Sequence, residues 1–485
     1  MLPGGVRRLA VTGLVLGTLL LGALIVLWLA LCDPPRLLVS PRRDFAMVGV
    51  TVVNPGQMRL SAQTVTVHDA RIGAIHPTRS DERPSTGAEQ FMGAFVLPGL
   101  VDVHIHLPPH WAAGQLERFM LLFLAHGVTT IREVGSLDGS SLRVREAVRS
   151  GALAGPRVFA CGPVLDGDPP SFPRARVVHT AEEGRRVVDE LATTGVDCIK
   201  VYRNLSQAAL AGVSEEAQRQ HLPVIGHLPA SAPWHETRIQ EIQHVCDPRC
   251  WQMGEHEIEE LVRAAVAGPV AHTPTLVVYE GQGGFFDYDE RREQPVARLL
   301  PRFWRDVLWN PAFALGFSPA PAAALGSYHG AQLQMVERIH EAVRRLHAAG
   351  ARIQVGTDPP NPFVVPGASV HREMRLLEKI GFTPEETWIA ATRNAGLALG
   401  VAQLGVLAPG APADLLVFRE DPTRDLRALE SLEAVFADGR FYPVEELKAA
   451  LAAQDHYFER WLYDRITVWV ATRLARAAGR WAPSD

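Results

Sequence analysis

Two histidines, His104 and His106, stand one residue apart at the end of an apolar run, in the segment FVLPGLVDVHIH at 95–106. Because side chains alternate between the two faces of an extended strand, both imidazoles are expected on one side, with Ile105 facing away. Two neutral imidazoles at the end of a buried strand can hold one divalent metal ion. The pair alone is weak evidence for a metal site, since a strand can also simply end in two polar residues.

Further residues of metal-binding type stand where other predicted strands end. They are Lys200 in VDCIKVY, His227 in PVIGH, His244 in EIQH and Asp358 in IQVGTD. Each has a structural explanation when taken alone, because a lysine can snorkel, a histidine can belong to the core and an aspartate can cap a helix. Together with the first two histidines they make a shared metal site the better interpretation.

The central part of the chain alternates predicted strands and helices, and this pattern favours a (β/α)8 TIM-like barrel of the α/β class. The strands are expected at 96–103, 128–134, 157–162, 196–202, 222–227, 241–245, 269–276 and 352–358. In such a barrel the active site lies at the carboxyl ends of the strands. The candidate metal ligands should therefore converge at one end of the barrel.

Strand-like segments with Gly and Pro turns both precede and follow the barrel, so we expect the two ends of the chain to pair in a small β-sandwich. The predicted organisation is an N-terminal signal anchor or transmembrane helix at 1–35, the first part of the β-sandwich at 36–95, the catalytic barrel at 96–403, the second part of the β-sandwich at 404–442 and a helical tail at 443–485.

The N-terminal segment has the pattern of a membrane anchor. Arg7 and Arg8 precede an uncharged run at 9–32. Roughly 20 apolar residues span a bilayer, and the run lacks a clear small-x-small cleavage site. We therefore expect an uncleaved signal anchor, with the arginines in the cytoplasm and the catalytic domain outside it, in the periplasm or the extracellular space. A buried helix of a soluble protein is the alternative.

The amino-acid composition limits the kinds of partner that the protein can bind. Of the 485 residues, 47% are hydrophobic and 21% charged, and the net charge is −5, so the chain is globular and gives no case for nucleic acid. Among five cysteines, Cys246 and Cys250 could pair in an oxidising compartment or stay free thiols. The expected partners are a small-molecule or dipeptide substrate and, through the N-terminal helix, the membrane. The oligomeric state stays open, and a homo-oligomer is allowed.

In their order and spacing the motifs resemble those of the amidohydrolase superfamily, over about 45–442. The motifs that carry the resemblance are PGLVDVHIH, GVTTIREVG at 127–135, IKVY at 199–202, IGH, IQH, VGTD and LAPGAPADLLVF at 407–418. The chain is most similar to the imidazolonepropionase-like branch, which includes metal-dependent Xaa-Pro and Xaa-Arg dipeptidases. This resemblance implies a hydrolase of amide bonds, with dipeptides or N-acyl amino acids as the expected substrates.

The resemblance also implies a binuclear metal centre. The first metal ion would be held by His104, His106 and Asp358, the second by His227 and His244, and both would be bridged by carboxylated Lys200. A lysine ammonium has no acceptor, so only its carbamate can bind a metal. Zinc is preferred for mixed imidazole and carboxylate ligands, although manganese, iron or cobalt could replace it. Asp358 would take a proton from the water that becomes the hydroxide shared by the two metals, and would pass it to the leaving amine.

Four more residues are expected near the mouth of the site. Tyr202, His272 and Tyr279 could orient a substrate carboxylate or carbonyl, although the tyrosines could equally be packing residues. His371 follows the last predicted strand, in the loop, and could line the pocket. The segment 281–330, rich in Phe, Trp and Pro, could be a lid over the metals or an ordinary surface subdomain.

Other functions remain open. A lactonase or an esterase could use the same site. Deaminases of this superfamily usually lack the bridging lysine, so Lys200 disfavours a deaminase. A non-catalytic tethered binding protein would be indicated by the loss of a metal ligand, and none is lost. The side-chain preference for the substrate cannot be derived from the sequence, because the loops that set it vary freely on this fold.

Overall fold

The computed structural model describes most of the chain. The described residues are 4–31, 33–109, 112–136, 138–172, 174–229, 238–245, 254–268, 270–283, 286–311, 322–401 and 403–478, with side chains left out at 4–14, 16, 30 and 322–328. Cys246 and Cys250, which could pair or stay free thiols, lie outside these residues.

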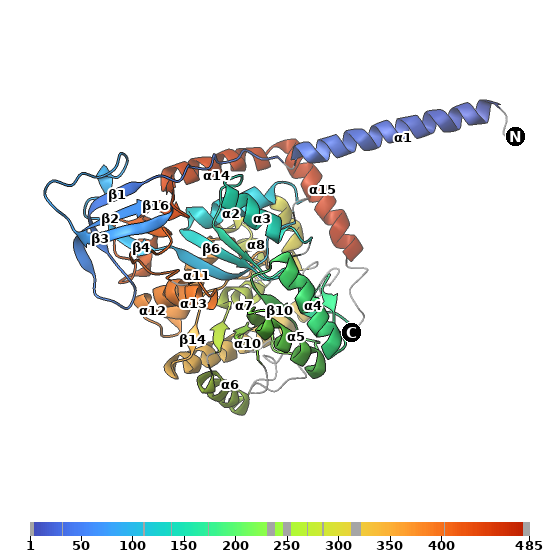
Figure 1. Ribbon diagram of the computed structural model, residues 1–485. Coiled ribbons are helices and arrows are strands. Elements are labelled where there is room, and N and C mark those ends of the chain that lie inside the picture. Colours follow the sequence, from blue (N-terminus) through green and yellow to red (C-terminus); the bar gives the residue numbers. More distant parts are fainter. Residues whose placement is uncertain are drawn as a thin grey trace.

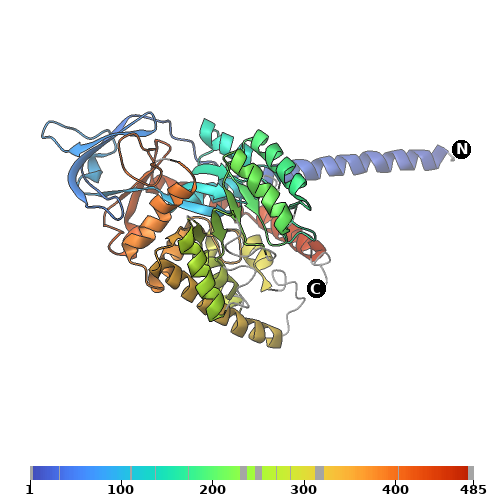
Figure 2. The ribbon, with the colours of Figure 1, turned by 60° about the horizontal axis from the view of Figure 1, so that its bottom comes forward.

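The centre of the molecule is an α/β fold with parallel sheets that fits a TIM-like barrel, as the sequence predicted (Figures 1 and 2). In the described residues its strands are β5 (Leu100–Ile105), β6 (Val128–Glu133), β7 (Arg157–Ala160), β10 (Ile199–Val201), β11 (Val224–Gly226), β12 (Glu241–Gln243), β13 (Ala271–Thr273) and β14 (Arg352–Ile353). Neighbouring strands pair in parallel from β5 to β7 and from β10 to β14. The short strands β8 (Leu165–Asp166) and β9 (Arg176–Val177) extend the second sheet from the loop after β7.

Two seams close the barrel. The N–H of Val103 donates to the carbonyl of Val355 at 3.1 Å, which joins β5 to the segment that follows β14. Between β7 and β10 the N–H of Asp197 donates to the carbonyl of Ala160 at 2.8 Å. At this second seam a disulfide joins Cys161 to Cys198, and both cysteines are buried. This disulfide was not predicted from the sequence.

The first predicted strand, 96–103, is divided at Gly99. Residues before the glycine form β4 (Phe95–Pro98), which belongs to a separate sheet, and residues after it form β5 of the barrel. A Cβ atom at Gly99 would collide with the Thr129 side chain. The glycine therefore allows the chain to pass closely over β6 where it leaves one sheet and enters the other.

Strands from both ends of the chain form one mixed sheet of seven strands, in the order β17-β16-β15-β4-β1-β2-β3. Their bounds are β1 (Phe45–Val52), β2 (Leu60–His68), β3 (Arg71–Pro77), β15 (Leu415–Phe418), β16 (Leu432–Ala437) and β17 (Arg440–Pro443). The prediction that both ends of the chain pair in one β module is right, and the sheet folds over an apolar core in which the rings of Phe45 on β1 and Phe441 on β17 stack with their centres 5.0 Å apart. Because β4 bonds to β1 on one edge and to β15 on the other, the strands join in a single sheet.

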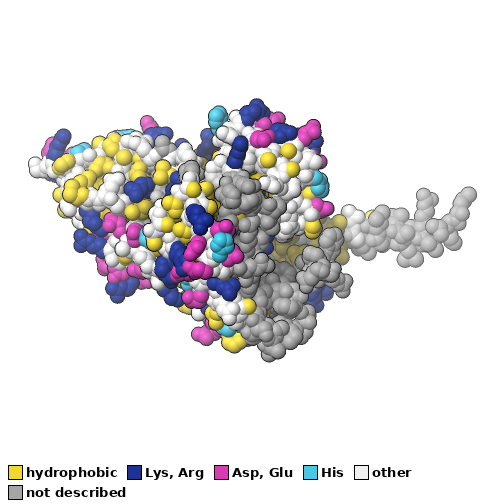
Figure 3. All heavy atoms as spheres, turned by 90° about the horizontal axis from the view of Figure 1, so that it is seen from below, with side chains coloured by type: hydrophobic (Ala, Val, Ile, Leu, Met, Phe, Trp, Pro, Cys, Tyr) yellow, Lys and Arg dark blue, Asp and Glu magenta, His cyan; other side chains and the backbone are white. Residues whose placement is uncertain are grey.

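Helices surround the barrel. They are α2 (Gln115–Ala125), α3 (Ser141–Ser150), α4 (Ala181–Thr194), α5 (Gln207–Arg219), α6 (Glu255–Ala267), α7 (Leu276–Gly283), α8 (Tyr288–Arg291), α10 (Ala322–Ala348), α11 (Ala368–Lys379), α12 (Pro384–Ile389) and α13 (Ala395–Ala398). Side-chain caps start several of them, such as Thr180, which accepts a hydrogen bond from the N–H of Glu183 at 3.1 Å. Figure 3 shows basic and acidic side chains intermingled on one face, and apolar side chains gathered at the end formed by the seven-stranded sheet.

The described part of the segment 281–330 packs on the barrel. A π-helical turn, Phe303–Leu308, is followed by Trp309, which is almost fully buried. The indole N–H of Trp309 donates to the carbonyl of Pro360 at 3.0 Å, close to Asp358 in the sequence. This tryptophan ties the segment to the loop that carries a candidate ligand. A lid function for the segment stays a prediction.

The two terminal segments are helical. The predicted anchor falls on α1 (Gly4–Leu31), which projects from the body in Figure 1. Among the residues that the structure describes, no helix combines the length and apolar character needed to cross a bilayer, so a transmembrane helix is not confirmed. The C-terminal tail forms two helices, α14 (Val444–Phe458) and α15 (Trp461–Ala478). Leu31 at the end of α1 belongs to the same buried apolar cluster as Tyr463 of α15.

Candidate active site

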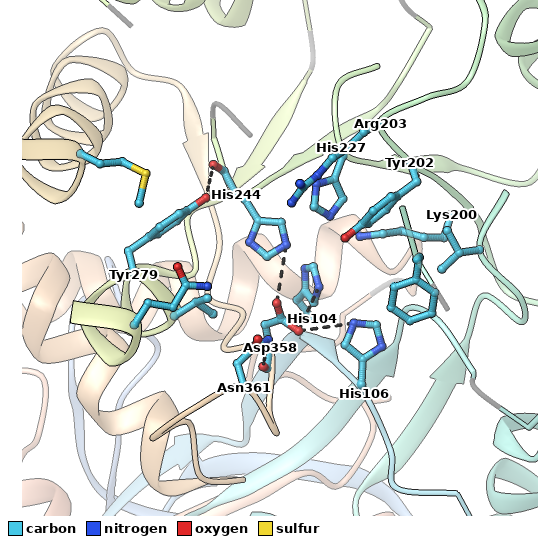
Figure 4. A pocket seen from close by; sticks show the side chains of 15 residues that line it. His104, His106, Lys200, Tyr202, Arg203, His227, His244, Tyr279, Asp358 and Asn361 are labelled. Atoms are coloured by element: carbon cyan, nitrogen blue, oxygen red, sulfur yellow. Dashed lines mark hydrogen bonds and ion pairs between the residues drawn. The ribbon is translucent and has the colours of Figure 1, made fainter. Parts of the chain in front are cut away.

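A cavity of about 280 Å³ opens at the carboxyl ends of the barrel strands (Figure 4). Its lining includes all six predicted metal ligands. The lining residues are His104, His106, Val164, Phe172, Lys200, Tyr202, Arg203, His227, His244, Val278, Tyr279, Gln282, Met335, Asp358 and Asn361. The side chains that the sequence places at five strand ends therefore meet in one cavity.

Asp358 lies at the centre of the candidate ligands. Ligand atoms of Asp358, His104 and His244 all lie within 4.8 Å of one another. The carboxylate Oδ1 is 3.6 Å from Nε2 of His104, and Oδ2 is 3.7 Å from Nε2 of His244. Oδ1 is also 3.4 Å from Nε2 of His106. Imidazole nitrogens facing a carboxylate at these distances form a donor set that fits a divalent transition metal.

Lys200 and His227 complete the group. Lys200 is 1% exposed on β10, and the ring centre of His227 lies 4.6 Å from that of His244. Burial, together with the charge of Lys200, lowers the pKa of both His104 and His227 well below the ordinary value. A neutral imidazole is the form that binds metals, so this environment favours the ligand state of both residues.

The Nδ1 atoms of two other histidines face acceptors. Nδ1 of His106 lies 3.1 Å from the carbonyl oxygen of Gly135, and Nδ1 of His244 lies 2.6 Å from Oγ1 of Thr275. The Thr275 hydroxyl donates to the carbonyl of Pro274 at 2.7 Å, so its oxygen is left to accept. Both imidazoles then carry their proton on Nδ1 and turn an unprotonated Nε2 toward Asp358.

The backbone at the strand ends is held in an unusual conformation. His244 has φ 61° and Asp358 has φ 60°, which are costly for residues other than glycine. The N–H of Asp358 donates to the carbonyl of His104 at 2.7 Å and so fixes this conformation. Strained residues held by their surroundings are common at active sites, where the strain serves to aim a side chain.

Charge on the His106 side of the cavity favours a cation. Burial disfavours the charged imidazole of His106, yet the carboxylates of Glu133 and Asp358 outweigh burial and raise its pKa. Glu133 is itself fully buried at the end of β6, and burial raises its pKa. This side of the cavity therefore attracts positive charge, either a proton on His106 or a metal cation.

Of the four predicted substrate residues, two line the cavity. The Tyr279 hydroxyl donates to the carbonyl of His244 at 3.1 Å, and the Tyr202 ring centre lies 4.0 Å from that of His227. His272 is not part of the lining. It is buried on β13, where Thr273 contacts Glu241 inside the barrel, so alternation points His272 the opposite way.

His371 also lies outside the cavity. The sequence analysis placed it in a loop, but it belongs to α11, and its Nε2 lies 2.8 Å from the carbonyl oxygen of His126. Because helix α11 turns this side chain toward the end of α2, it cannot line the pocket. His371 is a packing residue between two helices.

Several residues that line the cavity were not predicted from the sequence. The Arg203 guanidinium lies 5.4 Å from the Tyr202 ring centre, and the Phe172 ring stacks on His106 with ring centres 5.5 Å apart. Asn361 donates from Nδ2 to the carbonyl of Asp358 at 2.9 Å. Arg203 stands two residues after the end of β10, so its place after the Lys200 strand could have indicated it. Phe172 lies in an irregular loop, and no local pattern marks it.

Comparison with known proteins agrees with this architecture. The model of the Amidohydrolase family matches residues 95–266 and 328–442. An imidazolonepropionase from Deinococcus deserti is 26% identical over 400 residues, which cover 76% of this chain and 88% of that protein.

Solved structures share the fold. The bottromycin amidohydrolase superposes with a TM-score of 0.69 at 24% identity, over 89% of this chain and 92% of its own. An Xaa-Pro dipeptidase solved with methionine in its active site has a TM-score of 0.60 at 18% identity, over 83% of this chain and all (100%) of its own. The family is generally metal-dependent. The chain belongs to the amidohydrolase family, and it is a hydrolase that acts on carbon–nitrogen bonds.

Proposed function

We propose that this protein is a binuclear metal-dependent hydrolase that cleaves the amide bond of a dipeptide or an N-acyl amino acid. The observation that carries the proposal is the convergence of three imidazole Nε2 atoms on the carboxylate of Asp358, at 3.4 to 3.7 Å. Two divalent metal ions bound there, preferably zinc, would lower the pKa of water and polarise the scissile carbonyl.

The residues would divide the metal-binding task. His104, His106 and Asp358 would hold the first ion, His227 and His244 the second, and Lys200 would bridge both as its carbamate. Lys200 lines the same cavity as His104 and His227, which are assigned to different ions of the proposed pair. A bridging role for Lys200 agrees with that position.

Asp358 would move the proton. Its carboxylate faces the cavity and accepts the proton of the attacking water while the new carbon–oxygen bond forms at the carbonyl carbon. When the carbon–nitrogen bond breaks, Asp358 returns this proton to the leaving nitrogen, so that a neutral amine departs. The hydrogen bond from Asn361 to the Asp358 carbonyl holds the loop in place during both transfers.

The cavity wall supports a substrate that carries a carboxylate. Among the described lining residues Asp358 is the only carboxylate, whereas Arg203 brings a guanidinium to the same wall as His227 (Figure 4). Arginine binds carboxylates through paired, charge-assisted hydrogen bonds. Dipeptides and N-acyl amino acids both end in a free carboxylate, which Arg203 would receive.

We also propose that the catalytic domain works outside the cytoplasm. The disulfide between Cys161 and Cys198 supports this location, because disulfides persist in oxidising compartments. Membrane anchoring through the N-terminal helix stays a prediction from the sequence.

The test is a substrate panel on the purified zinc-loaded chain. Dipeptides and N-acyl amino acids should release a free amine, and Asp358→Asn should abolish the release. Matched esters and lactones form the comparison set. Cleavage of esters or lactones without any amide would contradict the proposal, and release of ammonia alone would indicate a deaminase instead.

A further inference from the structure

Buried polar side chains connect three barrel strands beneath the cavity. Arg132 on β6 pairs with Glu241 on β12, Gln243 on β12 contacts Glu241, and Gln243 also contacts His104 on β5. All four residues are at most 2% exposed. Polar groups this deep inside a barrel require defined partners, so the hydrogen bonds between them can be assigned one after another.

The first residue in this series of hydrogen bonds is Arg132. The Arg132 guanidinium carries N–H donors and no acceptor, and it donates to Oε1 of Glu241. Burial alone would raise the pKa of Glu241, but the charge of Arg132 and the hydrogen bonds from Arg132, Gln354 and Thr273 lower it. Glu241 is therefore an ionised carboxylate, which can accept hydrogen bonds but cannot donate them.

The charge of Glu241 fixes the orientation of the next amide. Because the carboxylate only accepts, the Gln243 group that faces it is the NH2, and Nε2 donates to Oε1 of Glu241. The amide oxygen of Gln243 is then turned to Nδ1 of His104. Amide orientation is often ambiguous, but here the neighbouring charge decides it.

We infer that Gln243 is a positioning residue for the metal site, which fixes His104 as the tautomer protonated on Nδ1 and so presents Nε2 to a divalent metal ion. The amide oxygen of Gln243 only accepts, so Nδ1 of His104 carries the hydrogen. Nε2 of His104 then faces Oδ1 of Asp358 at 3.6 Å with its lone pair. The inference rests on the proposed function in that it takes His104 as a metal ligand.

His104 differs from His106 and His244 in the kind of group that its Nδ1 atom contacts. Nδ1 of His106 faces a backbone carbonyl, and Nδ1 of His244 faces Thr275. Only the His104 contact, among these three, runs through a side-chain amide that is itself oriented by an ion pair. A substitution at Gln243 can therefore change one ligand and leave the other two in place.

The test uses two substitutions at Gln243 and one matched control. Gln243→Leu removes the acceptor. Gln243→Glu keeps one, because a protonated carboxyl donates to Glu241 through its O–H and accepts from Nδ1 through its carbonyl oxygen. The control, Gln354→Leu, removes another fully buried amide of the same interior, which bonds to Thr273 at 3.0 Å and also to Glu241. Arg132 and Thr273 still bind Glu241 in this variant, and among the described residues no contact of Gln354 with a metal ligand side chain is found, so the contact between Gln243 and His104 should persist.

Zinc affinity of the purified full-length variants is measured by chelator competition, and the visible spectrum of the cobalt-loaded protein reports the geometry. Gln243→Leu should weaken zinc binding by about 10- to 100-fold and alter the cobalt spectrum. Gln243→Glu should recover most of the affinity, and Gln354→Leu should bind zinc like the wild type. Circular dichroism compares the folded fraction of all variants.

Two results would overturn the inference. One is wild-type zinc affinity in Gln243→Leu, and the other is an equal loss of affinity in Gln354→Leu, which would indicate a general packing effect. In either case a wild-type chain that binds two zinc ions leaves the proposed function intact. A wild-type chain that binds no metal would overturn both.

Discussion

Oδ1 of Asp358 lies 3.4 Å from Nε2 of His106, although His106 follows the first strand of the barrel and Asp358 follows the last. The two residues meet because the barrel closes at this seam, where Val103 bonds to the carbonyl of Val355 at 3.1 Å. The hydrogen bond that closes the barrel at this seam therefore also brings His106 and Asp358 together in the candidate metal site.

Arg203 should decide how well a free carboxylate is bound. Arg203→Met should raise KM for an N-acyl amino acid by about 10- to 100-fold, the value of a charge-assisted hydrogen bond, with a smaller change in kcat. The measurement is steady-state hydrolysis of the free acid and of its amide-capped analogue. The analogue lacks the carboxylate and should be insensitive to the substitution.

The control variant for Arg203 is Arg427→Met, which removes an arginine that is 90% exposed at its side chain. It should leave both substrates unaffected. An equal loss for the free acid and the capped analogue in Arg203→Met would show that the guanidinium does not bind the carboxylate.

His371 should make the fold sensitive to acid. Burial, with the neighbouring His126, lowers the pKa of His371 to about 3. As pH falls below the ordinary histidine value of about 6.5, the unfolded chain takes up a proton that the folded chain refuses, so stability falls from about pH 6.5 toward pH 3. At pH 5 this amounts to about 2 kcal/mol.

His371→Gln keeps a donor toward the His126 carbonyl but cannot titrate. Urea unfolding at pH 7 and at pH 5 should show a smaller loss of stability on acidification in the variant than in the wild type. Because His371 lies outside the cavity, hydrolysis at pH 7 should be unchanged. Parallel pH dependence of the two proteins, or a loss of activity in the variant, would contradict this assignment.

The sequence predicted the barrel strands and the meeting of the six candidate ligands in one cavity, because the signals for both are local. An apolar run of a few residues that ends in His, Lys or Asp marks both a barrel strand and its functional end, as in the His227 and Asp358 segments. The single outer sheet was not predictable in the same way. It depends on β4 pairing on both edges, and no local pattern specifies which strands neighbour β4.

The other features that were not predicted from the sequence also depend on which residues become neighbours in the folded chain. Cys161 and Cys198 are 37 residues apart and meet only across the seam between β7 and β10. Gln243 looks like an ordinary strand residue until the folded barrel brings it to His104. His371 was misplaced because the helix α11 starts earlier than the predicted loop allowed.

The disulfide predicts how many free thiols the protein contains. The chain has five cysteines, so the unreduced, denatured protein should titrate three thiols, or one if Cys246 and Cys250 are paired as well. Replacing both Cys161 and Cys198 by alanine should lower the free energy of unfolding by about 3–4 kcal/mol, the chain-entropy value for a loop of this length. Five free thiols in protein isolated without reductant would contradict the pairing and the proposed location.

The most direct test of the account is the metal content of the purified chain by elemental analysis. The account predicts about two zinc ions per wild-type chain, with at least one lost in Lys200→Ala and both kept in the control Lys448→Ala, whose side chain is 63% exposed. A wild-type chain without metal, or a Lys200→Ala variant that keeps both ions, would contradict the binuclear centre.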